Sequence, residues 1–121
     1  MANAVNWFEI PATDFKRAND FYNTVFETEL VYMEGSDSSP MGMFPTEDGV
    51  SGAVIAGEGY VPSTKGSVVY LNGGEDLNDV LNRVEAAGGQ VMLAKMAIGE
   101  NGFVAFFMDS EGNRVGLHSM G

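Results

Sequence analysis

The chain has 121 residues, 45% of them hydrophobic, and six Lys and Arg against seventeen Asp and Glu give it a net charge of −11. This length suits one domain with a substantial core. The absence of cysteine excludes disulfides, thiolate metal sites and a cysteine nucleophile. Nucleic acid is a poor partner for so acidic a chain, because such binding neutralises phosphates with basic side chains. With no signal peptide and no long apolar run recognised, we expect a cytoplasmic protein that does not enter the membrane.

The first half of the chain has the pattern of a strand, a helix and three more strands. Residues 5–10 alternate in polarity up to Pro11, which cannot donate a hydrogen bond to a sheet and is expected to end the strand. Thr13 or Asp14 is suited to cap a helix that runs to about Phe26. Shorter strands are expected at 29–34, 41–45 and 50–56, with a loop at 35–40 after the first of them.

The second half repeats this order. A strand is expected at 67–72, then a helix that ends at Gly88 and Gly89, then strands at 90–98, 103–108 and 114–118. The run 103–108 is continuously aromatic and β-branched, which predicts a strand buried on both faces. In the last strand Val115 and Leu117 should face one side, and Arg114, Gly116 and His118 the other.

The two halves form an internal repeat. Adding 62 to the apolar helix positions of the first half gives those of the second, and the strands before the helices superimpose at an offset of 61, with Trp7 over Val68 and Glu9 over Tyr70. We therefore predict one domain over 1–121, with modules at 4–57 and 67–119 joined by a linker at 58–66. Two similar modules suggest a pseudo-twofold arrangement whose shared concave surface binds a ligand.

Three segments carry a resemblance to a known family: 14–22 after the first strand, 85–89 at the end of the second helix, and 109–118 with its Asp-Ser-Glu-Gly-Asn turn. Together they resemble the vicinal oxygen chelate superfamily of glyoxalase I, bleomycin-resistance proteins, fosfomycin-resistance enzymes and extradiol dioxygenases. The resemblance implies an α+β fold in which two βαβββ modules form a cupped mixed β-sheet around a cavity, with helices on the outer faces. It also implies a homodimer.

In metal enzymes of this family the ligands come from one inward position on the first and last strand of each module. The resemblance places these positions at Trp7, within 50–56, at Val68 and at Gly116, and the segment 50–56 contains no Asp, Glu or His. None of these side chains is a metal ligand. We therefore expect no metal at the usual site and no other cofactor, and the metal-dependent glyoxalase I mechanism does not carry over position by position. A divalent metal at a displaced site stays open.

A second set of candidate site residues occupies the next inward-facing position on three of these strands. Glu9, Tyr70 and His118 each follow a usual ligand position by two residues, so all three share the cavity face. Glu9 and His118 are suited to act as an acid and base in a lyase or isomerase, or as part of a displaced metal site, with Tyr70 orienting the ligand. The alternative is that the two side chains only satisfy each other by a hydrogen bond.

The preferred interpretation is a glyoxalase- or bleomycin-resistance-like protein that binds a small apolar or aromatic molecule without the family's metal. Its ligand-binding side chains are predicted to be Trp7, Glu9, Tyr70, Phe106 and His118. Met41, Met43 and Phe107 either line the same pocket or belong to the core. Lys95 and Arg114 either face an anionic group or are simply solvated.

Overall fold

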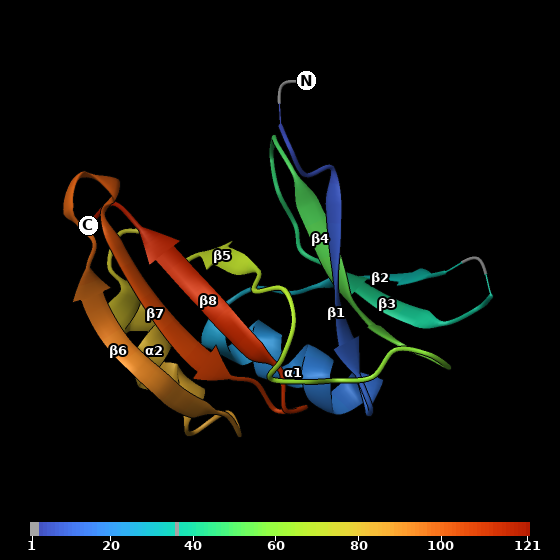
Figure 1. The fold of residues 1–121 in the computed structure, drawn as a ribbon. Coiled ribbons are helices and arrows are strands. Elements are labelled where there is room, and N and C mark those ends of the chain that lie inside the picture. The colour runs from blue at the N-terminus through green and yellow to red at the C-terminus, as the bar shows by residue number, and fades with distance from the viewer. Residues whose placement is uncertain (1–2, 36) are drawn as a thin grey trace.

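The computed structural model describes residues 3–35 and 37–121, and within them the chain forms two helices and eight strands (Figure 1). One residue of the expected loop 35–40, Ser36, lies outside the described residues. The first module contains β1 (Trp7–Ala12), α1 (Phe15–Val25), β2 (Val31–Glu34), β3 (Pro40–Met43) and β4 (Ser51–Ala56). The second contains β5 (Tyr70–Asn72), α2 (Leu77–Val84), β6 (Gln90–Ala97), a 3-10 turn (Gly99–Asn101), β7 (Phe103–Met108) and β8 (Arg114–Ser119).

Each module builds one four-stranded mixed sheet, and the two sheets have the same strand order. The first sheet is β1-β4-β3-β2 and the second is β5-β8-β7-β6. In both, the first strand of the module pairs in parallel with the last, while the remaining pairs are antiparallel. This repetition confirms the α+β fold of two βαβββ modules that the sequence predicts.

Several strand boundaries differ by one to three residues from those expected, including those of β1 and β5. Strand β1 does not stop at Pro11 but continues through it to Ala12. Proline is tolerated there because β1 is an edge strand, so its missing N–H interrupts no second ladder. Strand β5 begins only at Tyr70, which leaves Val68 in the segment before the strand. The cap of α1 is Asp14, whose carboxylate accepts a hydrogen bond from the Arg17 N–H at 3.1 Å.

The main hydrophobic core joins the two modules, and a small separate cluster of Met41, Ala53 and Ile55 lies within the first. Helix α1 packs on β3 and β4, α2 packs on β6, β7 and β8, and the helices contact each other (Figure 1). Phe21 and Tyr22 of α1 pack against Phe107 of β7, and all three rings are buried. Neither described helix is long and apolar enough to cross a membrane.

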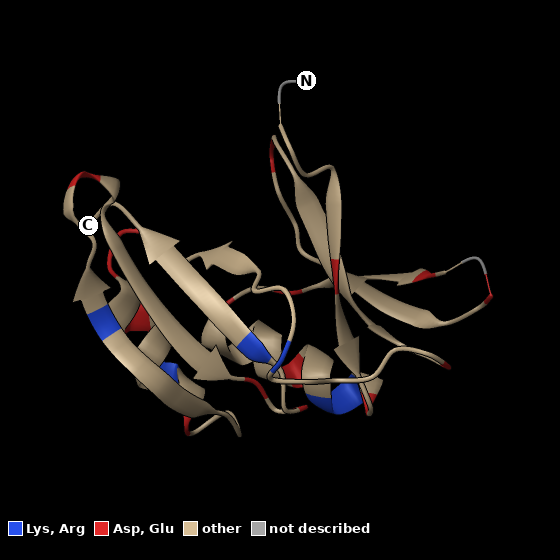
Figure 2. Ribbon diagram, in the orientation of Figure 1, with Lys and Arg blue, Asp and Glu red and all other residues tan. Residues whose placement is uncertain are grey.

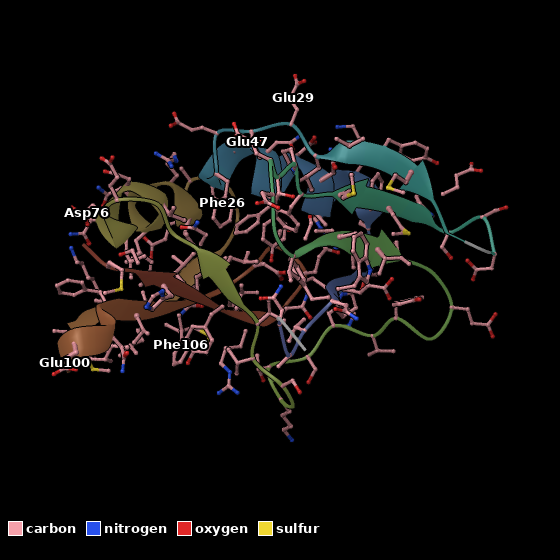
Figure 3. All side chains as sticks on the ribbon, turned by 90° about the horizontal axis from the view of Figure 1, so that it is seen from above. Phe26, Glu29, Glu47, Asp76, Glu100 and Phe106 are labelled. Carbon is pink, nitrogen blue, oxygen red and sulfur yellow. The ribbon has the colours of Figure 1, made fainter. Side chains whose placement is uncertain are left out.

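Strand β7 is buried on one face, not on both as its apolar run predicted. Ala105 and Phe107 are fully buried against the helices, but Val104, Phe106 and Met108 on the opposite face are only half-buried. The physical reason is that α2 covers one face of the second sheet, whereas no other helix or strand of residues 3–35 and 37–121 packs extensively on the opposite face. Figure 3 shows Phe106 on that open face, away from α2.

The turn between β7 and β8 links the second module to the first. The carboxylate of Asp109 accepts hydrogen bonds from the hydroxyl of Tyr22, at 2.7 Å, and from the backbone N–H of Asn113, at 2.9 Å. The Asn113 amide donates to the carbonyl of Pro11 at 2.7 Å, and its oxygen accepts from the Ser63 N–H at 3.1 Å. This turn therefore holds β1, α1 and the linker together.

Glu111, in the same turn, binds the start of α1. Its side chain has no exposed surface and accepts from the backbone N–H groups of Thr13 and Asp14 and from the Arg17 guanidinium. Burial by itself would raise the pKa of Glu111, but hydrogen bonds from Arg17, Asp14, Ser110 and Thr13 outweigh it and lower the pKa to about 2. The carboxylate thus stays charged and acts as a latch between the modules.

Candidate functional site

An aromatic pair covers the centre of the second sheet on its open face. Tyr70 of β5 and Phe106 of β7 both pair with Gly116 of β8, and their ring centroids lie 5.7 Å apart. A Cβ atom on Gly116 would come within 2.6 Å of Cδ1 of Tyr70. The glycine is therefore what allows the Tyr70 ring to lie over β8, and the space that a side chain at 116 would take is filled by that ring.

Arg114 lies beside this pair, two residues earlier on β8. Its guanidinium carbon is 5.9 Å from the centroid of the Phe106 ring, at the outer limit of a cation–π contact. Within residues 3–35 and 37–121, its Nε is the one buried side-chain nitrogen or oxygen without a hydrogen-bond partner. Such an atom is uncommon in folded proteins and marks a place where a partner is missing.

Glu9 lies on the open face of the first sheet. The indole N–H of Trp7 donates to its Oε2 at 3.2 Å. The negative charge of Glu9 also raises the pKa of the Tyr60 hydroxyl above its ordinary value, with a smaller contribution from burial. Glu9 pairs with Ala53 and Trp7 with Ser51, which fixes the register of β4 that the sequence left open.

His118 is held by the 3-10 turn before β7. Its Nε2 lies 2.6 Å from the carbonyl oxygen of Asn101. A carbonyl can only accept, so Nε2 carries the proton in this arrangement and donates it. That nitrogen has no free lone pair with which to bind a metal.

Among the described residues, no hydrogen bond joins Glu9 and His118, whose partners are Trp7 and Asn101. Glu9 lines a small cavity that Arg114 also lines. His118 is four residues farther along β8 than Arg114, a distance of about 13 Å at the usual rise of a strand. Among the described residues, the charged β8 side chain in the same cavity as Glu9 is thus Arg114, and proton transfer between Glu9 and His118 stays a prediction. Strand alternation alone could not predict which β8 side chain shares this cavity with Glu9.

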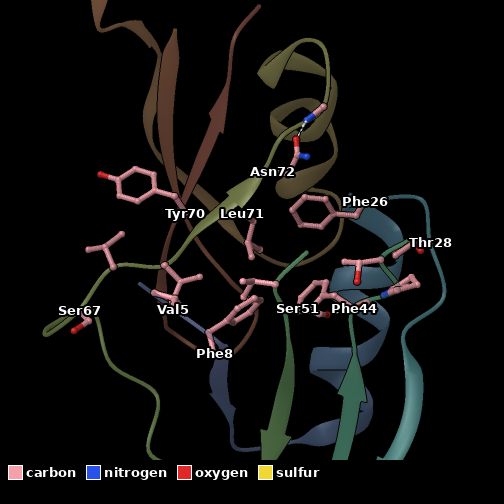
Figure 4. A pocket seen from close by; sticks show the side chains of 16 residues that line it. Val5, Phe8, Phe26, Thr28, Phe44, Ser51, Ser67, Tyr70, Leu71 and Asn72 are labelled. Atoms are coloured by element: carbon pink, nitrogen blue, oxygen red, sulfur yellow. Dashed lines mark hydrogen bonds between the residues drawn. The ribbon is translucent and has the colours of Figure 1, made fainter. Parts of the chain in front are cut away.

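A large cavity lies between the modules and is lined by residues of β4 and β5, among others (Figure 4). Its volume is about 890 Å³, within the range usual for small-molecule sites. Phe8, Phe26, Phe44 and Leu71 point into it, and polar groups at its rim include Asn72 (Figure 4). We call this space the inter-module cleft.

Of the predicted ligand-binding residues, only Tyr70 lines the inter-module cleft. Sequence reasoning missed Phe8, Phe26 and Phe44, because each is partly buried and packs against the core. An apolar residue at such a position has the sequence pattern of a core residue. The signal that could have indicated the cleft is the pair of edge strands β1 and β5, which begin the two modules.

Comparison with known proteins agrees with the fold. Residues 4–117 match the family model described as the Glyoxalase/Bleomycin resistance protein/Dioxygenase superfamily. The chain belongs to this superfamily. It is also 30% identical over 124 residues to proteins named "Putative glyoxylase CFP32" from Mycobacterium bovis and Mycobacterium tuberculosis. The match covers 93% of this chain but only 44% of those relatives, so the chain spans less than half of their length.

Solved structures of the superfamily share the fold at low sequence identity. A glyoxalase/bleomycin resistance protein from Albidiferax ferrireducens superimposes with a TM-score of 0.72 at 12% identity, covering 95% of this chain and 97% of that one. A glyoxalase-related enzyme from Fulvimarina pelagi gives 0.66 at 15% identity, covering 96% and 87%. A glyoxalase I mutant from Zea mays gives 0.68 at 18% identity, covering 93% of this chain and 45% of that one.

The superfamily's metal does not fit the residues present at its usual positions. Trp7, Val68 and Gly116 offer no ligand, and β4 contributes only Ser51, Ala53 and Ile55 to the open face. The Tyr70 ring lies over Gly116. In the described part of the chain no three His, Asp or Glu side chains cluster as a metal site would require. We therefore derive no reaction step through a metal.

Proposed function

We propose that this glyoxalase-superfamily chain binds a small apolar or aromatic molecule in the inter-module cleft. The observation that carries the proposal is a space of about 890 Å³ into which three phenylalanines and a leucine from both modules project. Binding buries apolar ligand surface against these side chains, at roughly 25 cal/mol per Å² removed from water. Asn72 and Ser51 at the rim supply the few polar contacts that orient a ligand.

A neutral fluorescent probe tests this proposal. Nile red should bind the purified protein with a blue-shifted emission and one site per chain. Val50 lines the cleft and is 36% exposed, so Val50→Trp should fill the space and weaken Nile red binding tenfold or more. Val31 on β2 is 46% exposed and outside the cleft, so Val31→Trp is the matched control and should change the affinity less than twofold. Equal affinities for both variants, or no binding to the folded protein, would contradict the proposal.

We also propose that the protein is a homodimer, as the resemblance implied. The open faces of both sheets leave large apolar side chains accessible, including Trp7 at 40% and Tyr70 at 49%. Met33, Met92 and Met96 are comparably exposed. Apolar surface on this scale is typical of a contact with another protein surface. Light scattering coupled to size exclusion should give about twice the chain mass of 12.9 kDa; a single species at the chain mass would reject the dimer.

A further inference from the structure

Two of the six basic side chains have no ion pair with any described residue. Among the residues that the structure describes, four are paired with a carboxylate within 4.0 Å: Lys16 with Asp20, Arg17 with Glu111, Arg83 with Glu27, and Lys95 with Asp76. Lys65 and Arg114 have no such pair. In a chain of net charge −11, unpaired cations are unexpected, because carboxylates outnumber them almost three to one.

Both unpaired cations line the same small cavity. Its volume is about 130 Å³, and it lies between β1, the linker and the start of β8. Figure 2 shows basic segments at the start of β8 and on the neighbouring linker. The cavity shares Ser67 and Val69 with the inter-module cleft, so the segment before β5 borders both spaces. We call it the linker cavity.

Hydrogen bonds hold the linker in place around this cavity. The backbone of Ser63 accepts from the Arg114 N–H at 3.3 Å and donates to the Asn113 side chain at 3.1 Å. The Ser63 hydroxyl accepts from the Lys65 N–H at 2.9 Å. Because these bonds fix the backbone on both sides of the two cations, the linker cavity needs little reordering to receive a ligand.

The buried Nε of Arg114 supplies the second observation. A buried N–H group without an acceptor costs about 1–3 kcal/mol relative to one that has a partner. A bound oxyanion would accept from this N–H and from the rest of the planar guanidinium, which matches a carboxylate in two parallel hydrogen bonds. The Nε of Arg114 that lacks an acceptor and the unpaired positive charge of its side chain would therefore both be satisfied by a bound oxyanion.

We infer that the linker cavity is an anion subsite that takes the carboxylate of a small organic acid, with Arg114 as its principal donor and Lys65 as a second cation. A carboxylate is favoured over phosphate because Glu9 lies on the same wall and repels a dianion more strongly than a monoanion. The apolar residues Val61, Val69 and Val115 complete the wall, which suits the hydrocarbon part of an acid. The carboxylate subsite is argued independently of the proposed function. Only the idea that the rest of the ligand is apolar rests on that proposed function.

Benzoate and its neutral analogue benzyl alcohol test the inference by calorimetry or NMR titration at low salt. Benzoate should bind at least tenfold more tightly than benzyl alcohol, and Arg114→Gln should abolish this preference. Lys16 is exposed and lies outside the linker cavity, so Lys16→Gln removes the same charge and should leave the preference intact. Glu9→Gln should strengthen benzoate binding severalfold, since it removes a repulsive charge from the wall.

Several outcomes would overturn the inference. Equal binding of benzoate and benzyl alcohol, or an Arg114→Gln variant that matches Lys16→Gln, would show that no carboxylate subsite exists here. Inorganic phosphate binding as tightly as benzoate would overturn the choice of a carboxylate. Should Arg114→Gln fail to fold, Arg114→Lys keeps the charge without the planar fork and should still weaken benzoate severalfold. Nile red should bind Arg114→Gln as tightly as the wild type. Loss of benzoate binding with unchanged Nile red binding then concerns the carboxylate subsite alone and not the inter-module cleft.

Discussion

The latch between Glu111 and the start of α1 gives a prediction whose size follows from the structure. The Glu111 carboxylate accepts from the N–H groups of Thr13 and Asp14, at 2.9 and 2.8 Å, and from Arg17, at 2.7 and 3.1 Å. Glu111→Gln keeps the shape of the side chain but removes its charge and turns one acceptor into a donor. The amide nitrogen then faces other donors, so at least one of these hydrogen bonds is lost.

The magnitude comes from the pKa of this carboxyl. The pKa falls from the ordinary 4.5 to about 2 on folding, and a pKa difference of one unit between the unfolded and folded states corresponds to about 1.4 kcal/mol. The folded pKa is the lower one, so the stabilisation is complete above pH 4.5 and is lost as the pH falls toward 2. The charged latch therefore contributes about 3 kcal/mol to the free energy of unfolding at pH 7, and roughly half of that at pH 3.

Urea unfolding between pH 7 and pH 3 tests this reasoning. At pH 7 we expect Glu111→Gln to lose about 2–3 kcal/mol relative to the wild type, with the difference narrowing as the pH falls. Glu58 is exposed in the linker and makes no hydrogen bond with its side chain among the described residues, so Glu58→Gln controls for the change in net charge. A loss below about 1 kcal/mol at pH 7, or a difference that stays constant down to pH 3, would refute the latch.

Three further predictions concern the hydrogen bond of Tyr22, the close contact at Gly116 and the metal content of the protein. Tyr22→Phe should lower the free energy of unfolding by about 1–2 kcal/mol, because it removes the buried hydrogen bond to Asp109; an unchanged urea midpoint would contradict this. Gly116→Ala should push the half-exposed Tyr70 ring off β8 at a cost below about 1 kcal/mol, and NMR contacts between Tyr70 and Phe106 that persist unchanged would argue against it. Purified protein should contain no stoichiometric divalent metal, and elemental analysis finding about one nickel, zinc, iron or manganese per chain would reject that expectation.

The fold was largely predictable from local pattern. The apolar stripes and caps give both helices, and the offset of 62 residues between them predicts that the two sheets share one strand order. The predictions for β1 and β7 were wrong for one common reason. Both depend on which strands and helices pack beside the element, and the local sequence pattern carries no information about these tertiary contacts. Pro11 stays in β1 because no strand pairs on its outer side, and β7 is half-buried because only one face has a helix over it.

The site was less predictable. Alternation along a strand fixes the face on which a side chain lies, but it does not fix which residues of the other sheet lie opposite that side chain. Glu9 and His118 were expected to share one cavity face, and among the described residues the small cavity that Glu9 lines is also lined by Arg114. The inter-module cleft depends on how far the two sheets diverge. That separation is set by the packing of α1 on both modules through Phe21 and Tyr22, which no periodicity in a single strand encodes.

Two of the three segments that carried the family resemblance, 14–22 and 109–118, hold the modules together. In the turn from Asp109 to Asn113, the side chains of Asp109, Glu111 and Asn113 bind α1, β1 and the linker. Tyr22, in the segment 14–22, is the partner of Asp109. These residues explain why the chain shares the superfamily's architecture, since they fix the relative position of its two modules. They do not explain chemistry, which in metal enzymes of the superfamily depends on the inward positions where this chain has Trp7, Val68 and Gly116 instead of ligands. The residues that specify the fold are thus distinct from the inward positions occupied by Trp7, Val68 and Gly116.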